Sequence, residues 1–279
     1  MNTNRQKEPG YAWAQNDLGV CYAEGYGGIQ SYSEAFKFFC EAAEKGDALA
    51  QFNLGLCYSL GKGVVQSYDE AARWYFKAAQ QGNTRAQVNL AYCYYYGNGV
   101  MQSLNDAVKW WRTAANQGDP KGLYELGCCY KNGEYVMQSN RKAVELWTKA
   151  AEKGYKSAQF NLGICYEDGV CESQNLQESF NWYYKAAEQG HLYAQYNVGV
   201  CYWNGRGIQK SYSNAIKWWS MAAQGGVASA QYNLGLCYEN GCGVKKSLDE
   251  ALKWFQLAAN QGHEKANRKV MTINNSKHE

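Results

Sequence analysis

The sequence predicts an all-α solenoid made of seven helix-turn-helix repeats. Three observations support this fold class. A motif of the form Ala-Gln-x-Asn-Leu-Gly-x-Cys-Tyr returns every 36 residues, glycines follow it at fixed spacing, and only two prolines occur in 279 residues. A fixed period of this size is typical of stacked helical units that bury their apolar faces on one another. The Cys-Tyr end of the motif stands, without a slip in register, at Cys21-Tyr22, Cys57-Tyr58, Cys93-Tyr94, Cys129-Tyr130, Cys165-Tyr166, Cys201-Tyr202 and Cys237-Tyr238.

The first helix of a repeat is predicted from the spacing inside the motif. In the second repeat Ala50, Leu54, Cys57 and Tyr58 are separated by four, three and one residues, which places them on one stripe of a helix. Gly55 lies within this helix, and we expect it to let a neighbouring backbone approach closely. The stripe therefore predicts a helix that packs one face against its neighbours.

The second helix is predicted from its start and stop signals. A glycine turn at residues 61–64 ends the first helix, and Ser67 with Glu70 three residues later forms a capping box. The helix is expected to stop at Gly82, in the position where a glycine often terminates a helix. The same glycine recurs at Gly46, Gly118, Gly154, Gly190, Gly226 and Gly262.

The second helices also account for most of the tryptophans. Eight of the ten fall in an aromatic pair at one position of the repeat, as in Trp110-Trp111 and Trp218-Trp219. Paired alanines accompany them and leave them room. We interpret these tryptophans as large wedges between helices rather than as ligand-stacking residues.

The combined pattern resembles the Sel-one-like repeat family, which is related to tetratricopeptide repeats but has a longer glycine turn. The matching columns read Ala-x-x-x-Leu-Gly-x-x-Tyr-x-x-Gly-x-Gly-Val, then Ala-x-x-Trp-Tyr-x-x-Ala-Ala-x-x-Gly. The resemblance covers residues 11–262 and implies a right-handed α/α superhelical solenoid of seven 36-residue repeats. Departures are local: Ala91 replaces the helix glycine, Tyr135 stands in a turn, and Asn175 replaces the capping serine.

The two ends of the chain differ from the repeats. Residues 1–10 are polar with scattered charge, and we expect a disordered lead. After the last repeat a further first helix begins, in which Arg268 and Lys269 make the surface polar. We interpret residues 263–273 as a C-terminal capping half-repeat and residues 274–279 as a frayed tail.

The charge balance excludes several classes of partner. The 28 basic and 25 acidic residues give a net charge of +3. This balance is too close to neutral for the basic surface that binds nucleic acid or an anionic membrane. No apolar run of 18 residues occurs, so no membrane insertion is expected, and residues 1–10 lack the apolar core of a signal peptide.

The cysteines are expected to be buried free thiols. Seven of the eleven occupy one position of the repeat, about 10 Å from their neighbours at ordinary helix-packing distances. A disulfide needs Cα atoms within about 7 Å, so these cysteines cannot pair with one another. This favours a reducing compartment, and we expect a cytoplasmic protein. Cys171 and Cys242 lie near Cys165 and Cys237 in the sequence. Each of these two pairs is compatible with a local disulfide, with one edge of a metal site, or with a turn thiol that has no specific role.

No catalytic, cofactor or metal site is expected. His191 and His263 share a turn position after a helix-ending glycine, and His278 lies in the tail. No nucleophile stands beside a general base in a way that the repeat does not already explain. No Cys-x-x-Cys pair occurs, and the glycine turns follow no strand, which argues against a phosphate loop.

The candidate binding surface is the second face of the first helices. The resemblance to tetratricopeptide arrays implies that this face lines a concave groove. Tyr95, Tyr96 and Trp203 are aromatic where other repeats carry polar residues, which favours exposure. For the leading position, held by Phe52 and its equivalents, packing between repeats explains the aromatics equally well. The candidate partner-binding residues are Phe52, Tyr92, Tyr95, Tyr96, Tyr124, Phe160, Tyr196, Trp203 and Tyr232.

These observations predict a monomeric, non-catalytic scaffold or adaptor that binds a protein or peptide partner in an aromatic groove. The alternative implied by the family is an enzyme, because a secreted cysteine-rich branch has been linked to β-lactam binding and hydrolysis. That branch pairs cysteines between the two helices of a repeat, where this chain has alanines such as Ala50 and Ala79.

The thiol interpretation has a direct test. Titration of unfolded, unreduced protein from a reducing host should count at least seven thiols, one for each repeat. Peptide maps under non-reducing conditions should contain no linked pair of these cysteines. Loss of folding in the presence of a reductant would contradict the interpretation.

Overall fold

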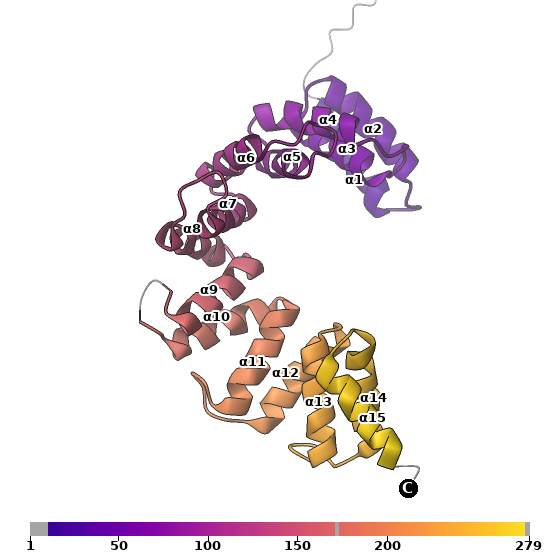
Figure 1. Ribbon diagram of the computed structural model, residues 1–279. Coiled ribbons are helices and arrows are strands. Elements are labelled where there is room, and N and C mark those ends of the chain that lie inside the picture. Colours follow the sequence, from indigo (N-terminus) through magenta and orange to yellow (C-terminus); the bar gives the residue numbers. More distant parts are fainter. Residues whose placement is uncertain (1–10, 171–172, 277–279) are drawn as a thin grey trace, which may run out of the picture. The chain divides into compact units, whose positions relative to one another are not determined.

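The computed structural model describes residues 11–170 and 173–276 of the chain, and every regular element in these ranges is an α-helix. The chain divides into two compact units, residues 1–139 and 140–279, each of which is described by itself (Figure 1). The expected lead at residues 1–10, Cys171 and His278 lie outside the described residues. The predicted all-α repeat architecture is confirmed.

Each described helix has 13 residues, and helices of the first and second kind alternate along the chain. The first unit contains α1 (Ala12–Glu24), α2 (Tyr32–Glu44), α3 (Ala48–Leu60), α4 (Tyr68–Gln80), α5 (Thr84–Tyr96), α6 (Leu104–Asn116) and α7 (Pro120–Asn132). The second unit contains α8 (Asn140–Glu152), α9 (Lys156–Asp168), α10 (Leu176–Glu188), α11 (Leu192–Asn204), α12 (Tyr212–Gln224), α13 (Ala228–Asn240), α14 (Leu248–Asn260) and α15 (Glu264–Ser276). The last helix therefore includes residues 274–276, which we had assigned to the frayed tail.

Side-chain caps start both kinds of helix. The Ser67 hydroxyl accepts a hydrogen bond from the Glu70 amide at 3.3 Å, as the capping box predicts, and Asn175 caps α10 in the same way. First helices use Asp or Asn, as where Asp47 accepts from the Ala50 amide at 2.7 Å. His191 takes this role in α11, where its Nδ1 accepts from the Ala194 amide. The turn position expected for the histidines is thus a capping position.

In five of the described first helices a glycine receives an aromatic ring from the second helix of the same repeat. A Cβ built on Gly163 would lie 2.4 Å from the Tyr183 ring, and one on Gly235 would lie 2.4 Å from the Phe255 ring. Gly55 has the same relation to Tyr75, at 2.6 Å. The expected close approach of a neighbouring backbone is also found at Gly55, because the Ala71 carbonyl oxygen would lie 3.3 Å from the same Cβ. The ring and this backbone oxygen together fill the space beside the glycine.

The second member of the aromatic pair is buried, and in Trp218-Trp219 the first member is buried as well. Trp111 is buried, whereas Trp110 is only half-buried, so the wedge interpretation applies to Trp111 and has to be corrected for Trp110. The glycine is absent in this repeat, because Ala91 stands there. The buried indole N–H of Trp111 has no hydrogen-bond partner among the described residues, while that of Trp219 donates to the Tyr196 carbonyl at 3.1 Å.

Buried glutamines connect successive repeats. The Gln51 side chain donates to the Ala43 carbonyl at 3.2 Å and accepts from the Gln81 side chain at 2.8 Å. The same arrangement recurs at Gln87, Gln159 and Gln231. The second bond is missing at Gln195, because Gly225 stands where a glutamine donates elsewhere. The carboxamide oxygen of Gln195 is buried without a partner among the described residues.

The turns keep their geometry where the sequence departs. Tyr135 has a φ of 54°, the left-handed conformation of the glycine that it replaces. Gly99 at the equivalent position is tightly enclosed, because an added Cβ would lie 2.0 Å from the Tyr68 carbonyl oxygen. Tyr135 thus adopts a backbone conformation that is unfavourable in free energy for any residue other than glycine.

The structure has free thiols of the repeat position at Cys21, Cys57, Cys93, Cys129, Cys201 and Cys237, and Cys242 is free as well. Burial raises the pKa of the Cys57 thiol to about 11. Burial, with Glu167 nearby, raises the pKa of Cys201 to about 12. A thiol with such a pKa is almost entirely protonated at neutral pH, which makes it a poor nucleophile and a poor metal ligand.

The ring-on-glycine contact predicts that Gly235→Ala destabilises the chain by about 1–3 kcal/mol, because the new methyl group overlaps the Phe255 ring. Urea unfolding should measure this cost. It should shrink when Phe255 is first replaced by leucine, which leaves room for the methyl group. Stabilisation of the single variant, as expected from the helix propensity of alanine alone, would contradict the contact.

The unpartnered Gln195 oxygen predicts a stabilising pair of substitutions. Leu192 contacts Gly225, since a Cβ there would lie 2.3 Å from its side chain, and the φ of −74° at Gly225 suits any residue. Leu192→Ala with Gly225→Gln should therefore be more stable than Leu192→Ala alone by about 1 kcal/mol, measured by urea unfolding. Equal stability of the two variants would show that the oxygen already has a partner such as water.

Candidate functional site

The leading aromatic position of the first helices serves packing more than binding. Phe52 is buried, with its ring 6.1 Å from that of Tyr75, which corrects the expectation that it lines an open groove. Phe160 lies 5.7 Å from Tyr183 and stacks at 4.5 Å on the capping His191. Tyr232 repeats this arrangement on Phe255 and His263, at 5.7 and 4.6 Å. These contacts pack the three rings onto the second helix of their own repeat and, for Phe160 and Tyr232, also onto the residue that caps the next helix. They are not the contacts of first helix on first helix between repeats that the sequence left open as the alternative.

Three tyrosines of α5 form an aromatic surface in the first unit, which we call the tyrosine cluster (Tyr92, Tyr95 and Tyr96). Tyr92 and Tyr95 lie on Trp111 of α6, with ring centroids 5.6 and 5.5 Å away. Tyr96 is 62% exposed and packs edge-on against Tyr95 at 4.9 Å. The cluster thus rests on the buried Trp111 and exposes the ring of Tyr96, an arrangement that suits contact with a partner.

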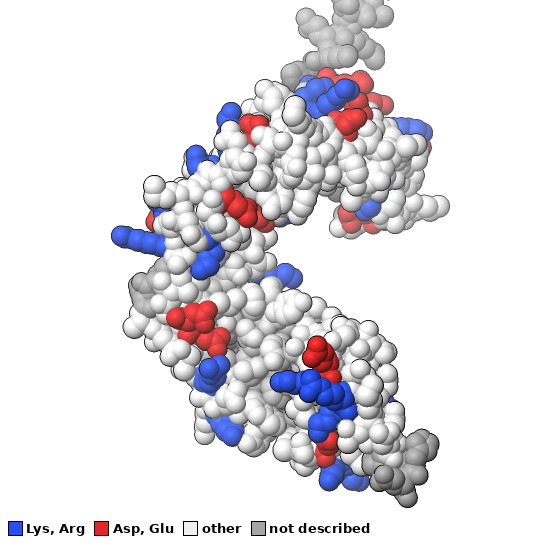
Figure 2. Space-filling model, in the orientation of Figure 1, with Lys and Arg blue, Asp and Glu red and all other residues white. Residues whose placement is uncertain are grey.

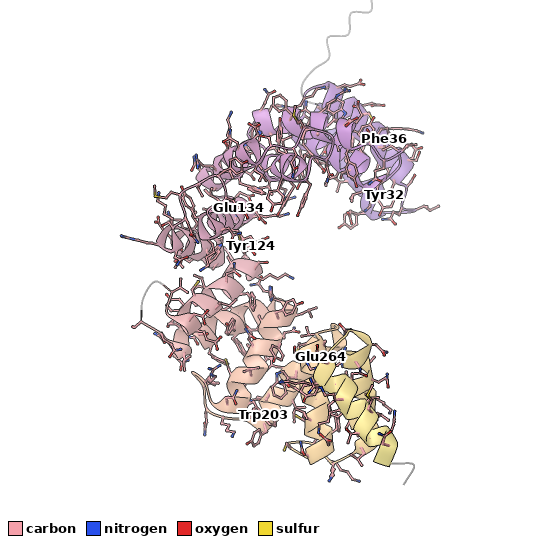
Figure 3. The ribbon with its side chains drawn as sticks, viewed as in Figure 1. Tyr32, Phe36, Tyr124, Glu134, Trp203 and Glu264 are labelled. Atoms are coloured by element: carbon pink, nitrogen blue, oxygen red, sulfur yellow. The ribbon has the colours of Figure 1, made fainter. Side chains whose placement is uncertain are left out.

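Charged groups of α7 and its turn border the tyrosine cluster. The Tyr92 hydroxyl donates to the Glu125 carboxylate, and the Lys121 ammonium lies 4.5 Å from the Tyr92 ring centroid. Burial raises the pKa of Glu125, against the opposing effects of Tyr92 and Lys121. The carboxylate of Glu134, followed by burial, raises the pKa of Tyr95. Figure 3 shows Glu134 and Tyr124, which is half-buried, in this part of the unit.

Sequence reasoning missed Lys121 and Glu125, although a signal was present. Position 125 holds a glutamate where the neighbouring repeats carry Asn89 and Asn161. A half-buried carboxylate where the neighbouring repeats hold an amide is a departure from the repeat of the same kind as the aromatic ones.

The second unit contains a pocket beside Trp203, which we call the Trp203 pocket (Figure 3). Its volume is about 370 Å³, and it is lined by Tyr196, Val200, Trp203, Asn204, Trp219, Asn233, Leu236, Asn240 and Cys242. These residues come from α11, α12, α13 and the turn after α13. The pocket therefore opens between the first helices of two successive repeats.

Trp203 forms one wall of this pocket and is held by other rings. Its ring centroid lies 5.2 Å from that of Trp219 and 4.6 Å from that of Tyr212. The side-chain amides of Asn204 and Asn240 donate to carbonyls of their own helices, at 3.1 and 2.9 Å. The pocket thus combines fixed apolar walls with amide groups at its lining, as ligand and peptide sites do.

A second recess, of about 540 Å³, lies in the first unit on the second-helix side. Trp74, Phe76, Lys77 and Tyr94 are among its lining residues, and the Lys77 ammonium lies 3.8 Å from the Trp74 ring centroid. Trp74 is half-buried and forms part of this surface, which corrects its assignment to the core. Phe76 stands at a position that varies among the repeats, which hold Cys40, Arg112, Thr148, Tyr184, Ser220 and Gln256 there.

No group of three or more His, Cys, Asp or Glu side chains that could hold a metal ion occurs in the described part of the chain. Within residues 11–170 and 173–276 no helix is long and apolar enough to cross a bilayer. Figure 2 shows basic and acidic side chains interspersed in small groups on the visible face.

The fold and these surfaces define a helical-repeat protein of the solenoid class. The Sel1 repeat model matches residues 14–47, 48–83, 84–119, 120–155, 156–191, 192–227 and 228–263. The chain therefore belongs to the Sel1 repeat family, whose members generally mediate protein–protein interaction.

Solved structures support this assignment. A protective antigen of uropathogenic Escherichia coli strains with an SLR fold is 35% identical, with a TM-score of 0.82, and the match covers 94% of this chain but 56% of the antigen. A Sel1 repeat protein from Oxalobacter formigenes is 32% identical, with a TM-score of 0.78 and coverage of 95% and 76%. Yeast Tom70, at 12% identity, a TM-score of 0.50 and coverage of 98% and 56%, shares the fold alone. No curated protein matches the chain.

Proposed function

We propose that the chain is a non-catalytic interaction scaffold that binds a peptide or protein segment through its first helices. The observation that carries this proposal is the Trp203 pocket. Its volume of about 370 Å³ suits one or two large side chains, and its walls are rigid rings. Because Asn204, Asn233 and Asn240 also line it, a bound segment would find amide partners for its backbone.

The tyrosine cluster is proposed as a second contact surface for the same class of partner. Its outer ring, Tyr96, is exposed at little cost in free energy because its hydroxyl is polar, and the ring gains contact area when a partner binds. Tyrosine at such positions is typical of interface hot spots. Of the aromatics predicted from the sequence, we therefore retain Tyr92, Tyr95, Tyr96, Tyr196 and Trp203 as candidates.

The non-catalytic part of the proposal is supported by where the reactive residue types lie. Except for the half-buried Cys21, the thiols of the repeat position are buried. Burial raises the pKa of Cys93 to about 11 and, with Glu134 and other neighbours, that of Cys129 to about 12. His191 and His263 use their Nδ1 atoms as helix caps. Neither residue type is placed to act as a nucleophile or general base. The same free, buried thiols favour a reducing compartment, and we propose the cytoplasm.

The proposal is tested by separating binding from stability. Partner recovered by affinity capture should bind Trp203→Ala or Tyr96→Ala more weakly by about 1–2 kcal/mol or more. Tyr96→Ala should melt close to the unchanged protein, because most of its ring is exposed. Trp111→Ala should instead lose about 3–5 kcal/mol of stability through a core cavity.

The matched control for these variants is Met221→Ala, which removes an exposed apolar side chain from α12 outside the residues that line the pocket. Calorimetric titration of all four variants with the recovered partner gives the comparison. Equal loss of affinity in Met221→Ala and Trp203→Ala would remove the pocket from the proposal. Unchanged affinity in Trp203→Ala and Tyr96→Ala would overturn the assignment of both surfaces.

A further inference from the structure

The turns of the first unit expose one apolar side chain per repeat at an equivalent position. Ile29, Val65, Met101 and Met137 follow one another at intervals of 36 residues. Their exposed fractions are 89%, 86%, 88% and 90%. We call these four residues the apolar turn row. In the second unit the same position holds Ser173, Gln209 and Lys245, which are polar.

The backbone of the turn fixes this exposure. On one side of Val65 the half-buried Val64 packs against the core. On the other side the Gln66 side chain donates to the Ser59 carbonyl at 2.8 Å, and Ser67 caps the next helix. Val65 is thereby directed outward. Gln30, Gln102 and Gln138 make the equivalent bonds beside the other three members, to the carbonyls of Ala23, Tyr95 and Lys131.

The fold does not require apolar residues here, because the second unit forms the same turn with Gln209 and Lys245. The Ser211 cap and its bond to the Tyr202 carbonyl at 2.9 Å match those of the first unit. Four nearly fully exposed apolar side chains at one position therefore call for another explanation. Single exposed apolar side chains are ordinary on protein surfaces, but here they recur at one position of four successive repeats of the first unit and not in the second. This recurrence points to contact with a partner or with lipid.

The surroundings of the row are uncharged and partly aromatic. Residues 25–31, 61–67, 97–103 and 133–139 contain one basic and one acidic residue, Lys62 and Glu134. Tyr26 and Tyr135 in these turns are 70% and 64% exposed. A tyrosine has an apolar ring and a polar hydroxyl, which suits the boundary between lipid headgroups and acyl chains.

We propose that the apolar turn row docks the first unit on the surface of an electrically neutral lipid bilayer. The four side chains would enter the boundary between headgroups and acyl chains, with Tyr26 and Tyr135 at headgroup level. Contact is peripheral, and its strength comes from burial of apolar surface rather than from attraction between charges, since these turns carry no net charge.

Two features of the row favour lipid over a second copy of the chain. Four side chains of this size bury only a few hundred Å², roughly half of the ~800 Å² that each partner contributes to a stable protein interface. The side chains also project singly, one per repeat, with bonded glutamines beside them. A second copy would need matching holes at this spacing, whereas a bilayer accepts projecting apolar groups without a complementary shape.

The test is co-sedimentation of the full chain with phosphatidylcholine vesicles. The unchanged protein should sediment with the vesicles, with little dependence on salt. Val65→Ser with Met101→Ser should lower the partition coefficient at least 10-fold. Met221→Ser with Met271→Ser, which removes exposed apolar side chains from helices of the second unit, should leave it unchanged. Because Val65 and Met101 are 86% and 88% exposed, the first pair should melt as the unchanged protein does.

Three outcomes would overturn the proposal. The first is no sedimentation of the unchanged protein with vesicles. The second is an equal loss in the control pair, which would make the effect a general one of surface apolarity. The third is a concentration-dependent dimer in sedimentation velocity without lipid that Val65→Ser with Met101→Ser abolishes, because the row would then contact a second copy. None of these outcomes bears on the Trp203 pocket, so the two proposals fail independently.

Discussion

The contact between a helix glycine and an aromatic ring sets the distance between the two helices of a repeat. In the repeats that contain α9 and α13, the ring of Tyr183 or Phe255 occupies the volume that a Cβ on Gly163 or Gly235 would need. The two helices therefore approach closely, and the small alanines that flank each ring complete a core with little free volume. Every other feature of the repeat is built around this pair.

Once this core is formed, polar side chains serve mainly to connect and to cap. Buried glutamines such as Gln51 donate to a carbonyl at the end of the preceding repeat and accept from a glutamine of their own repeat. Histidine, usually the residue of general acid–base chemistry, caps α11 and α15 through Nδ1. Burial lowers the pKa of His191, helped by Lys156, which keeps the ring neutral and able to accept this bond. The residue types that could suggest catalysis thus hold the array together.

Function is left to the positions that the core does not constrain. Trp203 can replace a polar residue on α11 because Trp219 and Tyr212 support its ring from within the same unit. Tyr95 rests on Trp111 in the same manner. The exposed Val65 and Met101 have no such support and are held outward by the bonded turn. The Trp203 pocket and the tyrosine cluster suit a partner with a fixed shape, such as a peptide or protein. The apolar turn row suits a lipid surface, which adapts to projecting side chains.

The sequence by itself determined the fold class, the number of repeats, the capping boxes and the buried thiols, because each rests on local spacing that recurs seven times. It also singled out Trp203, Tyr95 and Tyr96, since a departure from a repeated pattern is visible without coordinates. Only the tertiary structure decided which ring of an aromatic pair is buried, since Trp110 and Trp111 are equivalent in composition and differ only in direction. Tertiary contacts likewise placed Phe52 in the core and brought Glu125 beneath Tyr92. Such contacts join residues on different helices, and sequence spacing carries no information about the distance between them.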